Sequence, residues 1–404
     1  MINLTLNKKV IIFGFIFTFF SSFGQSFFLG LFNAPIRNEL GITHGQFGSI
    51  FAIATIFSSL VLIWIGKKID EYNLISYSIF VICLLGFSSF FFSNIKNIFL
   101  LFFGIFLMRL SGQGLMGHTA STAVSRFFTK NRGKALGITW LGLSSSEFIL
   151  PICITFLLSV LSWNKVWVVI SLFIIIFLPL ICFKTIRTIS LSSREKTDEE
   201  LVDNKIKHWK RIEVIRDFKF YVIASNLLAM PWIATGIFVY QSFITESKLW
   251  STFAIPKAFM AYSVMSILTI FVTGSLIDRF TSRKIIPFMN IPLLIAMLVM
   301  YFGSLEIYSF VLFGLLGISN GLSNLLGSST WAEIYGVKHI GSIKALTTSF
   351  MVFSTAFGTA LFGILIDKKL SIESISMVCA FYIVTMFAFL IVFRKKIEPI
   401  KLVN

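Results

Sequence analysis

Long apolar runs, almost free of charged residues, recur along the whole chain and constrain its fold more than any other feature. Twelve of them lie at 10–32, 44–66, 74–93, 98–125, 135–157, 166–183, 218–243, 254–274, 285–303, 306–332, 345–366 and 375–393. A helix needs about 20 mostly apolar residues to cross a bilayer. The pattern therefore predicts an all-α integral membrane protein with twelve transmembrane helices.

The composition excludes a soluble enzyme and a disordered chain. Of the 404 residues, 56 % are apolar and 13 % are charged, whereas soluble domains carry roughly 25 % charged residues. A soluble surface has no place for so much apolar side chain, and a disordered chain has too little of it. All four cysteines lie inside apolar runs, so we expect small packing side chains and neither disulfides nor metal ligands.

The net charge of +17 has its explanation in membrane topology. With both termini cytoplasmic, 27 of the 35 Lys and Arg residues fall on cytoplasmic stretches, seven fall outside, and one, Arg109, lies within a span. Basic residues are retained on the cytoplasmic side of membranes. We therefore predict a multi-pass protein of the inner (plasma) membrane, with both termini cytoplasmic and no nucleic-acid partner. The first run is long enough to span, so we expect an uncleaved helix and not a signal peptide.

A single long polar stretch, 184–217, separates six spans from six. It predicts an N-terminal six-helix bundle at 1–183, a cytoplasmic linker at 184–217 and a C-terminal six-helix bundle at 218–404. Gly66 and Asp70 follow span two, and the same two residue types follow span eight as Gly274 and Asp278. Both pairs of positions are separated by 208 residues. These matches indicate a duplication with both copies in the same orientation.

The same two loops resemble a signature of the major facilitator superfamily, Gly-x3-Asp-Arg/Lys-x-Gly-Arg-Arg/Lys. The copy from Gly274 to Lys284 follows it, except that Thr and Ser stand in the region of the second glycine, and the copy at Gly66 has Glu71 in place of a base. Span four, from Arg109 to Gly117, is partly similar to another signature of the family. The resemblance implies two six-helix bundles that transport solutes by alternating access, with no catalytic residue and no cofactor.

The resemblance also implies a gating role for the residues of the two loops, namely Gly66, Asp70, Gly274, Asp278, Arg279 and Arg283. Asp70 and Asp278 stand at the ends of their helices. A carboxylate there accepts hydrogen bonds from the N-terminus of a neighbouring helix and pairs with arginine. Such a contact latches two helices in one state of a transport cycle. The alternative is a tight turn that only fixes topology.

Two charged residues stand out because they lie not near a span end but deep inside predicted spans, where charge is costly and usually functional. Arg109 is near the middle of span four and Glu147 is in span five. The two spans are antiparallel, so the two side chains reach similar depth. One interpretation has Arg109 binding an anionic group of the solute while Glu147 takes up a proton or exchanges partners. The other is a static buried ion pair that fixes helix packing.

Further polar side chains concentrate in or next to spans one, four, seven and ten, which line the cavity in the family that the chain resembles. These candidates for solute binding or coupling are Gln25, Gln113, His118, Tyr240, Gln241, Asn320 and Asn324. His118 has either a proton-carrying role or a packing role. For each amide, the alternative is a hydrogen bond between helices.

We predict a secondary active transporter of a small organic solute. Because of Arg109, we expect that solute to be an organic anion such as a carboxylate. Whether transport is coupled to protons stays open. The partners of the transporter are the solute and the lipid bilayer, and we expect a monomer. The first alternative is an exporter of cationic or amphipathic compounds that uses Glu147. The second is a non-transporting membrane sensor. We find no motif for a metal site, a nucleophile or a nucleotide loop, so neither an enzyme nor an ATP-driven pump is expected.

Overall fold

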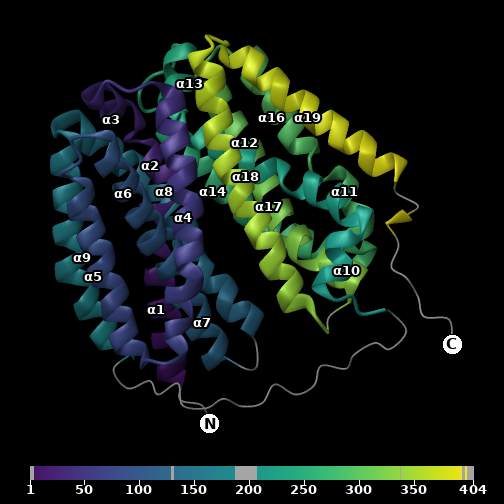
Figure 1. Cartoon of the computed structure of the whole chain (residues 1–404), viewed down its shortest axis with the longest axis horizontal. Coiled ribbons are helices and arrows are strands. Elements are labelled where there is room, and N and C mark those ends of the chain that lie inside the picture. The colour runs from purple at the N-terminus through teal and green to yellow at the C-terminus, as the bar shows by residue number, and fades with distance from the viewer. Residues whose placement is uncertain (1–3, 129–131, 187–206, 337, 394–395, 398–404) are drawn as a thin grey trace. The chain divides into compact units, whose positions relative to one another are not determined.

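The computed structural model describes residues 4–128, 132–186, 207–336, 338–393 and 396–397 (Figure 1). The regular structure of these residues is helical, without a strand. Twelve segments are long and apolar enough to cross a membrane: Lys8–Gly30, His44–Asp70, Leu74–Phe92, Ile98–Phe127, Gly133–Val160, Trp163–Ile186, Phe218–Val239, Ala254–Phe280, Ser282–Phe302, Ile307–Tyr335, Ile340–Asp367 and Ile372–Val392. Each coincides with one predicted run, so the prediction of twelve spans is confirmed.

The chain divides into two compact units. One contains the described residues up to Ile186 together with Phe238–Phe243, and the other contains the remaining described residues from Lys207 onward. Most of the predicted linker 184–217 lies outside the described residues. The predicted bundle boundaries stay a prediction.

The first unit is built around two long helix pairs. Its helices are α1 (Leu4–Ser21), α2 (Ser26–Gly30), α3 (Asn33–Leu40), α4 (His44–Gly66), α5 (Leu74–Phe92), α6 (Ile98–Met108), α7 (Gly117–Phe127), α8 (Arg132–Val160) and α9 (Trp163–Ile186), with short helical turns η1 (Ser22–Gly24) and η2 (Lys67–Asp70) and a π-helical segment η3 (Arg109–Met116). Helix α1 packs along α8, and α5 packs along α9 (Figure 1). Small residues allow the approach, since a Cβ on Gly142 of α8 would meet the carbonyl oxygen of Phe15.

The second unit has the same kind of helix packing. Its helices are α10 (Arg211–Arg216), α11 (Phe218–Leu227), α12 (Ala229–Val239), α13 (Gln241–Ser247), α14 (Ala254–Phe280), α15 (Ser282–Ile285), α16 (Ile291–Phe302), α17 (Ile307–Tyr335), α18 (Ile340–Asp367) and α19 (Ile372–Val392), with a 3₁₀ turn η4 (Ile286–Phe288). Helix α14 packs along α17, and α16 packs along α19 (Figure 1). The α14–α17 contact runs through Gly317 and Gly321, where a Cβ would meet the carbonyl oxygens of Tyr262 and Ser266.

Four spans are interrupted, which the apolar runs do not indicate. Span one breaks between α1 and α2, span four becomes π-helical between α6 and α7, and span nine consists of α15, η4 and α16. Span seven is divided between α11 and α12 and ends at Val239. The predicted span 218–243 was therefore too long, and Tyr240 and Gln241 lie beyond its end.

In the loop after span eight, Thr281 has a backbone conformation that is unfavourable for threonine. Thr281 follows α14 with φ 67° and ψ 150°, a region that is populated almost only by glycine. It stands where the family signature has glycine. Its counterpart in the first copy, Asn73, has an ordinary extended backbone and caps α5 by accepting a hydrogen bond from the Ser76 amide at 2.7 Å.

Replacing Thr281→Gly should therefore raise the free energy of unfolding by about 1 kcal/mol, because the strain that is released exceeds the entropy cost of glycine. Asn73→Gly, at the matched position, should lower it by a few tenths of a kcal/mol because the side-chain cap of α5 is lost. Thermal unfolding of the purified protein in detergent measures both. A lower midpoint for Thr281→Gly than for the unchanged protein would contradict the strain at this position.

Candidate functional site

Span one is broken in its middle by a short non-helical segment. Helix α1 ends at Ser21, one 3₁₀ turn covers Ser22–Gly24, and Gln25 is extended (φ −79°, ψ 153°) before α2 starts at Ser26. The serines contribute, because the hydroxyls of Ser21 and Ser22 donate to carbonyls of the preceding turn. The break leaves main-chain groups without helical partners, and inside a membrane these need partners from elsewhere.

Span four lies directly against this break. Its middle, Arg109–Met116, is π-helical, a form found mostly at functional sites. Gly24 and Gly112 face each other with no side chain between them: a Cβ on Gly112 would lie 2.6 Å from the Gly24 nitrogen, and one on Gly24 would meet the Met108 carbonyl oxygen and the Gln113 nitrogen. The two backbones are therefore in direct contact.

Arg109 supplies a partner for the broken span. Its Nη1 donates to the Gly24 carbonyl oxygen at 3.1 Å and to Ser26 Oγ at 3.2 Å, and its Cζ lies 5.3 Å from the centre of the Phe51 ring. The residue is 3 % exposed, and Nε has no hydrogen-bond partner. Both hydrogen-bond partners of Arg109 are neutral, so no carboxylate balances its positive charge.

Glu147 lies on α8, next to the residue through which α8 contacts the same break. It is 8 % exposed and makes no hydrogen bond or ion pair with any residue that the structure describes. The preceding residue, Ser146, accepts a hydrogen bond from Ser22 Oγ in η1. Glu147 thus presents an unpartnered carboxyl group one residue from the contact between α8 and the break.

Arg109 and Glu147, for which the sequence leaves mutual contact open, form no ion pair with each other. Arg109 is held by Gly24 and Ser26, while α8 contacts the break through Ser146 and Ser22. Arg109 and Ser146, the residue before Glu147, therefore contact the same segment of span one. A static ion pair between Arg109 and Glu147 is absent from the described residues.

Gln25 and Gln113 lie at the contact between spans one and four. Gln25 is the extended residue of the break, and Gln113 belongs to the π-helical segment. Both are half-buried, and neither side-chain amide is hydrogen-bonded within the described part of the chain. Arg109, Gln25 and Gln113 thus form one group of polar residues at the break in span one, and Glu147 follows Ser146 on the neighbouring helix α8.

His118 lies apart from this group, at the end of span four. Its Nε2 is 3.0 Å from the Gly66 carbonyl oxygen, which it reaches as a hydrogen-bond donor. It shares a cavity of about 500 Å³ with Gly66, Asp70 and Arg126. There Asp70 is ion-paired with Arg126, whose Nη1 also lies 3.4 Å from the Ile69 carbonyl oxygen. Asp70 therefore has the arginine partner that the sequence suggests.

The second copy of this loop is arranged differently, which corrects the expectation for Asp278. Asp278 is exposed and has no partner among the described residues. The carboxylate that accepts from the start of a helix is Glu333 of α17, bonded to the Ser282 amide at 2.8 Å and the Arg283 amide at 3.3 Å. Arg283 Nε lies 3.7 Å from the same carboxylate. Arg279 instead lies over the Phe280 ring, and the position of Gly274 has open space around it.

Tyr240 and Gln241 are buried and are fixed by main-chain contacts. The Tyr240 hydroxyl donates to the His44 carbonyl oxygen at 2.9 Å. Gln241 Nε2 donates to the Phe27 and Phe238 carbonyl oxygens, both at 2.9 Å. These bonds belong to the first compact unit, which includes Phe238–Phe243. They match the alternative of hydrogen bonds between helices.

Asn320 and Asn324 share one face of α17 but differ in environment. Asn320 Nδ2 donates to Ser266 Oγ of α14 at 2.9 Å, which ties the two helices together. Asn324, one turn further on, is exposed and has no hydrogen bond within the described residues. Among the described residues, no group of three His, Cys, Asp or Glu is placed to hold a metal ion.

Sequence reasoning missed Arg126, Glu333 and Ser26 as interacting residues. The first two stand at the ends of spans four and ten, where a charged residue looks like an ordinary span boundary. Ser26 gains its role only from the break beside it. The signal for the break was the cluster Ser21-Ser22-Phe23-Gly24, which is also compatible with a continuous membrane helix.

These features define a polytopic helical membrane protein with charged side chains gathered at a broken span. The family model of the Major Facilitator Superfamily matches residues 14–256 and 221–403. The chain belongs to this family, and it is a membrane transporter and not an enzyme. No curated protein sequence matches it.

Solved structures of transporters have the same fold. A bacterial homologue of the human lysosomal transporter Spinster, in an inward-facing and unoccupied conformation, is similar with a TM-score of 0.65 and 13 % identity, over 98 % of this chain and 97 % of the other. The nucleoside transporter NupG is similar with a TM-score of 0.69 and 14 % identity, over 96 % and 99 %. At this identity the likeness concerns the fold.

The contact between Gly24 and Gly112 can be tested with one methyl group. Gly24→Ala should lower the free energy of unfolding by about 1–3 kcal/mol, because the Cβ meets backbone atoms that have no rotamer to change. Gly137→Ala in α8 is the matched control, since its Cβ meets open space and alanine favours helix. Equal melting temperatures for the two variants in detergent would contradict the direct contact.

The exchange of roles between Asp278 and Glu333 gives a second comparison. Glu333→Ala should lower the free energy of unfolding by about 1–2 kcal/mol, because two main-chain amides lose a charged acceptor. Asp278→Ala should change it by less than about 0.5 kcal/mol. Chemical or thermal unfolding of the purified variants gives both values. A larger loss for Asp278→Ala would restore the role that the sequence suggests for it.

Proposed function

We propose that this transporter carries a small organic anion, such as a carboxylate, by alternating access. The observation that carries the proposal is the buried Arg109 guanidinium, which has neutral partners and a free Nε–H. A buried cation without a counter-ion is costly. An anionic solute that reaches it gains charge-assisted hydrogen bonds and removes that cost.

Glu147 is the proposed site of proton uptake, which would make the transporter a proton symporter. Its carboxyl group has no partner among the described residues, so it takes up and releases a proton without breaking an ion pair. Arg109 contacts the break in span one at Gly24, and Ser146, the neighbour of Glu147, contacts it at Ser22. Anion binding and protonation thus act on one backbone segment. Gln25 and Gln113 supply uncharged hydrogen bonds to the solute.

The remaining polar candidates have secondary roles in the proposal. His118, with Gly66, belongs to the loop contact of Asp70 with Arg126. Asn324 faces the solute pathway of the second bundle, whereas Asn320 holds its helix to α14. The ion pairs Asp70–Arg126 and Arg283–Glu333 act as gates that break and re-form during the cycle.

For its cellular setting we propose a monomer in the inner membrane with both termini cytoplasmic. The support is the distribution of basic residues, 27 of 35 on one predicted side. Under this proposal the bundles are 1–183 and 218–404, and 184–217 is a cytoplasmic linker. The similar structure of a nucleoside transporter supports a small organic solute, and Arg109 favours a charged one.

Transport by the purified protein in proteoliposomes tests the two roles separately. Arg109→Gln should reduce uptake of radiolabelled carboxylates by about tenfold or more, because a charge-assisted contact is lost. Glu147→Gln should retain carboxylate exchange but lose accumulation driven by a pH gradient. Lys165→Gln, an exposed cation of the same unit, should transport like the unchanged protein.

Arg109→Lys, measured together with thermal stability, separates solute binding from support of the broken span. It retains a cation beside Gly24 but loses the forked geometry, so we expect a stable protein with weaker uptake. If carboxylate uptake persists in Arg109→Gln, the anion proposal is wrong. Efflux of cationic compounds that needs Glu147 and not Arg109 would instead identify an exporter.

A further inference from the structure

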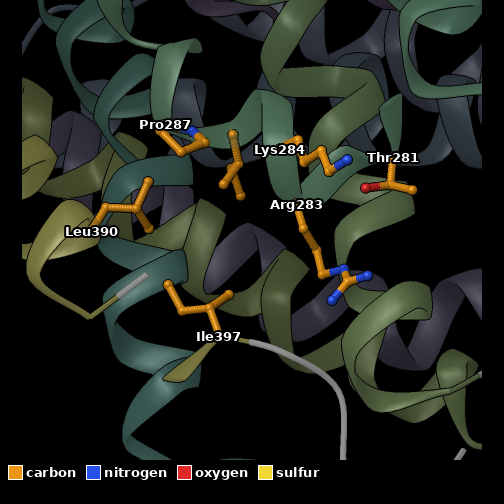
Figure 2. A pocket seen from close by; sticks show the side chains of 7 residues that line it. Thr281, Arg283, Lys284, Pro287, Leu390 and Ile397 are labelled. Carbon is orange, nitrogen blue, oxygen red and sulfur yellow. The ribbon is translucent and has the colours of Figure 1, made fainter. Parts of the chain in front are cut away.

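A second cavity lies in the other compact unit, far along the chain from the Arg109 group. It has a volume of about 150 Å³ and is lined by Thr281, Arg283, Lys284, Ile286, Pro287, Leu390 and Ile397 (Figure 2). The lining comes from the loop after α14, from α15 and η4, and from the end of α19 and the segment beyond it. None of these residues belongs to the proposed solute site.

The two faces of the cavity differ in chemistry. Figure 2 shows Arg283 and Lys284 on one side, with the Lys284 ammonium directed toward the Thr281 hydroxyl. On the opposite side lie Pro287, Leu390 and Ile397, which are buried and carry no polar side-chain group. The cavity therefore offers cations to one part of a ligand and apolar contact to another.

The Arg283 cation is only partly satisfied by its neighbour Glu333. The Glu333 oxygens accept the main-chain amides of Ser282 and Arg283. The guanidinium Nε lies 3.7 Å away, and this buried nitrogen has no hydrogen-bond partner. Lys284 is exposed and forms no ion pair with the residues that the structure describes. Two donors thus remain available to an anion.

The cavity has room for a small polyatomic anion. Holding one water molecule requires about 10–15 Å³ of cavity volume, so 150 Å³ leaves room for a phosphate group. A tetrahedral anion with several acceptor oxygens also suits two separate cationic donors.

The surroundings suit a membrane–water boundary, because exposed aromatic and basic side chains occur together. Phe280 and Phe288, on either side of the lining segment in the sequence, are 42 % and 56 % exposed. Exposed basic residues of the same unit include Lys210, Arg211, Arg216, Arg279 and Lys396. Beside them, a hydrogen bond from Lys207 and one from the Lys210 amide hold the pKa of the Glu213 carboxyl below its usual value. Basic pockets between helices at such boundaries attract anionic headgroups.

We propose that this cavity binds a phosphate group, with Arg283 and Lys284 facing the anion and the apolar wall facing attached carbon chains. The apolar wall and the exposed aromatic residues favour an anionic phospholipid as the source of that phosphate. Inorganic phosphate offers the same anion without the chains. The cavity is distinct from the proposed solute site at Arg109, although it shares Arg283 with the proposed gate, and phosphate binding there does not depend on the proposed anion specificity.

The test compares ligands on the full-length purified protein. Phosphatidylglycerol, phosphatidylcholine and inorganic phosphate are titrated separately, and binding is followed by native mass spectrometry and by the shift in melting temperature. We expect phosphatidylglycerol to bind more tightly than phosphatidylcholine, and its binding to weaken as salt is raised. The double variant Arg283→Gln, Lys284→Gln should weaken it by about tenfold.

Two further variants keep the test independent of folding. Lys284→Arg retains the charge and should bind phosphatidylglycerol like the unchanged protein. Arg279→Gln removes a cation from the same loop but not from the cavity lining, and should also bind normally. Phosphate binding that the double variant weakens, with phosphatidylglycerol no tighter than phosphatidylcholine, would assign the cavity to the free anion. Equal loss in the double variant and in Arg279→Gln, or no loss in either, would overturn the proposal.

Discussion

The direct backbone contact between Gly24 and Gly112 is the constraint on which the candidate site depends. It brings the broken part of span one, where the α-helix is interrupted, against the π-helical part of span four. In a medium without water, the freed carbonyl of Gly24 needs a donor, and Arg109 supplies one. The charge therefore has a structural task and a free Nε–H at the same time. A solute that binds Arg109 would bind directly beside the backbone contact.

The apolar runs were sufficient to predict the fold, because span length and hydropathy are set by the bilayer and not by long-range contacts. The interruptions of spans one and four were not predictable in this way, since Ser and Gly are tolerated in continuous membrane helices as well. Whether Arg109 and Glu147 pair was open for the same reason. Similar depth in two antiparallel spans does not reveal that the break holds Arg109 at Gly24 and α8 at Ser22.

The two copies of the loop signature show how a duplicated element diverges while its structural requirement persists. In the first copy an acid of span two meets a base of span four, Asp70 with Arg126. In the second copy the acid lies on span ten and the base at the start of span nine, Glu333 with Arg283. Similarity of sequence pointed to Asp278, but the second loop bonds to a carboxylate from α17. A residue that matches the family signature therefore does not by itself identify which carboxylate makes the contact in each copy.

The assignment of Phe238–Phe243 to the first compact unit has a consequence for how the protein is assembled. The bonds from Tyr240 to His44 and from Gln241 to Phe27 are made by chain that is synthesised after the central linker. These two bonds to the first six spans can form only once span seven has been made, because Tyr240 and Gln241 follow it in the chain. Separately expressed halves would therefore be unequal partners: the first would lack hydrogen-bond donors that only the second carries.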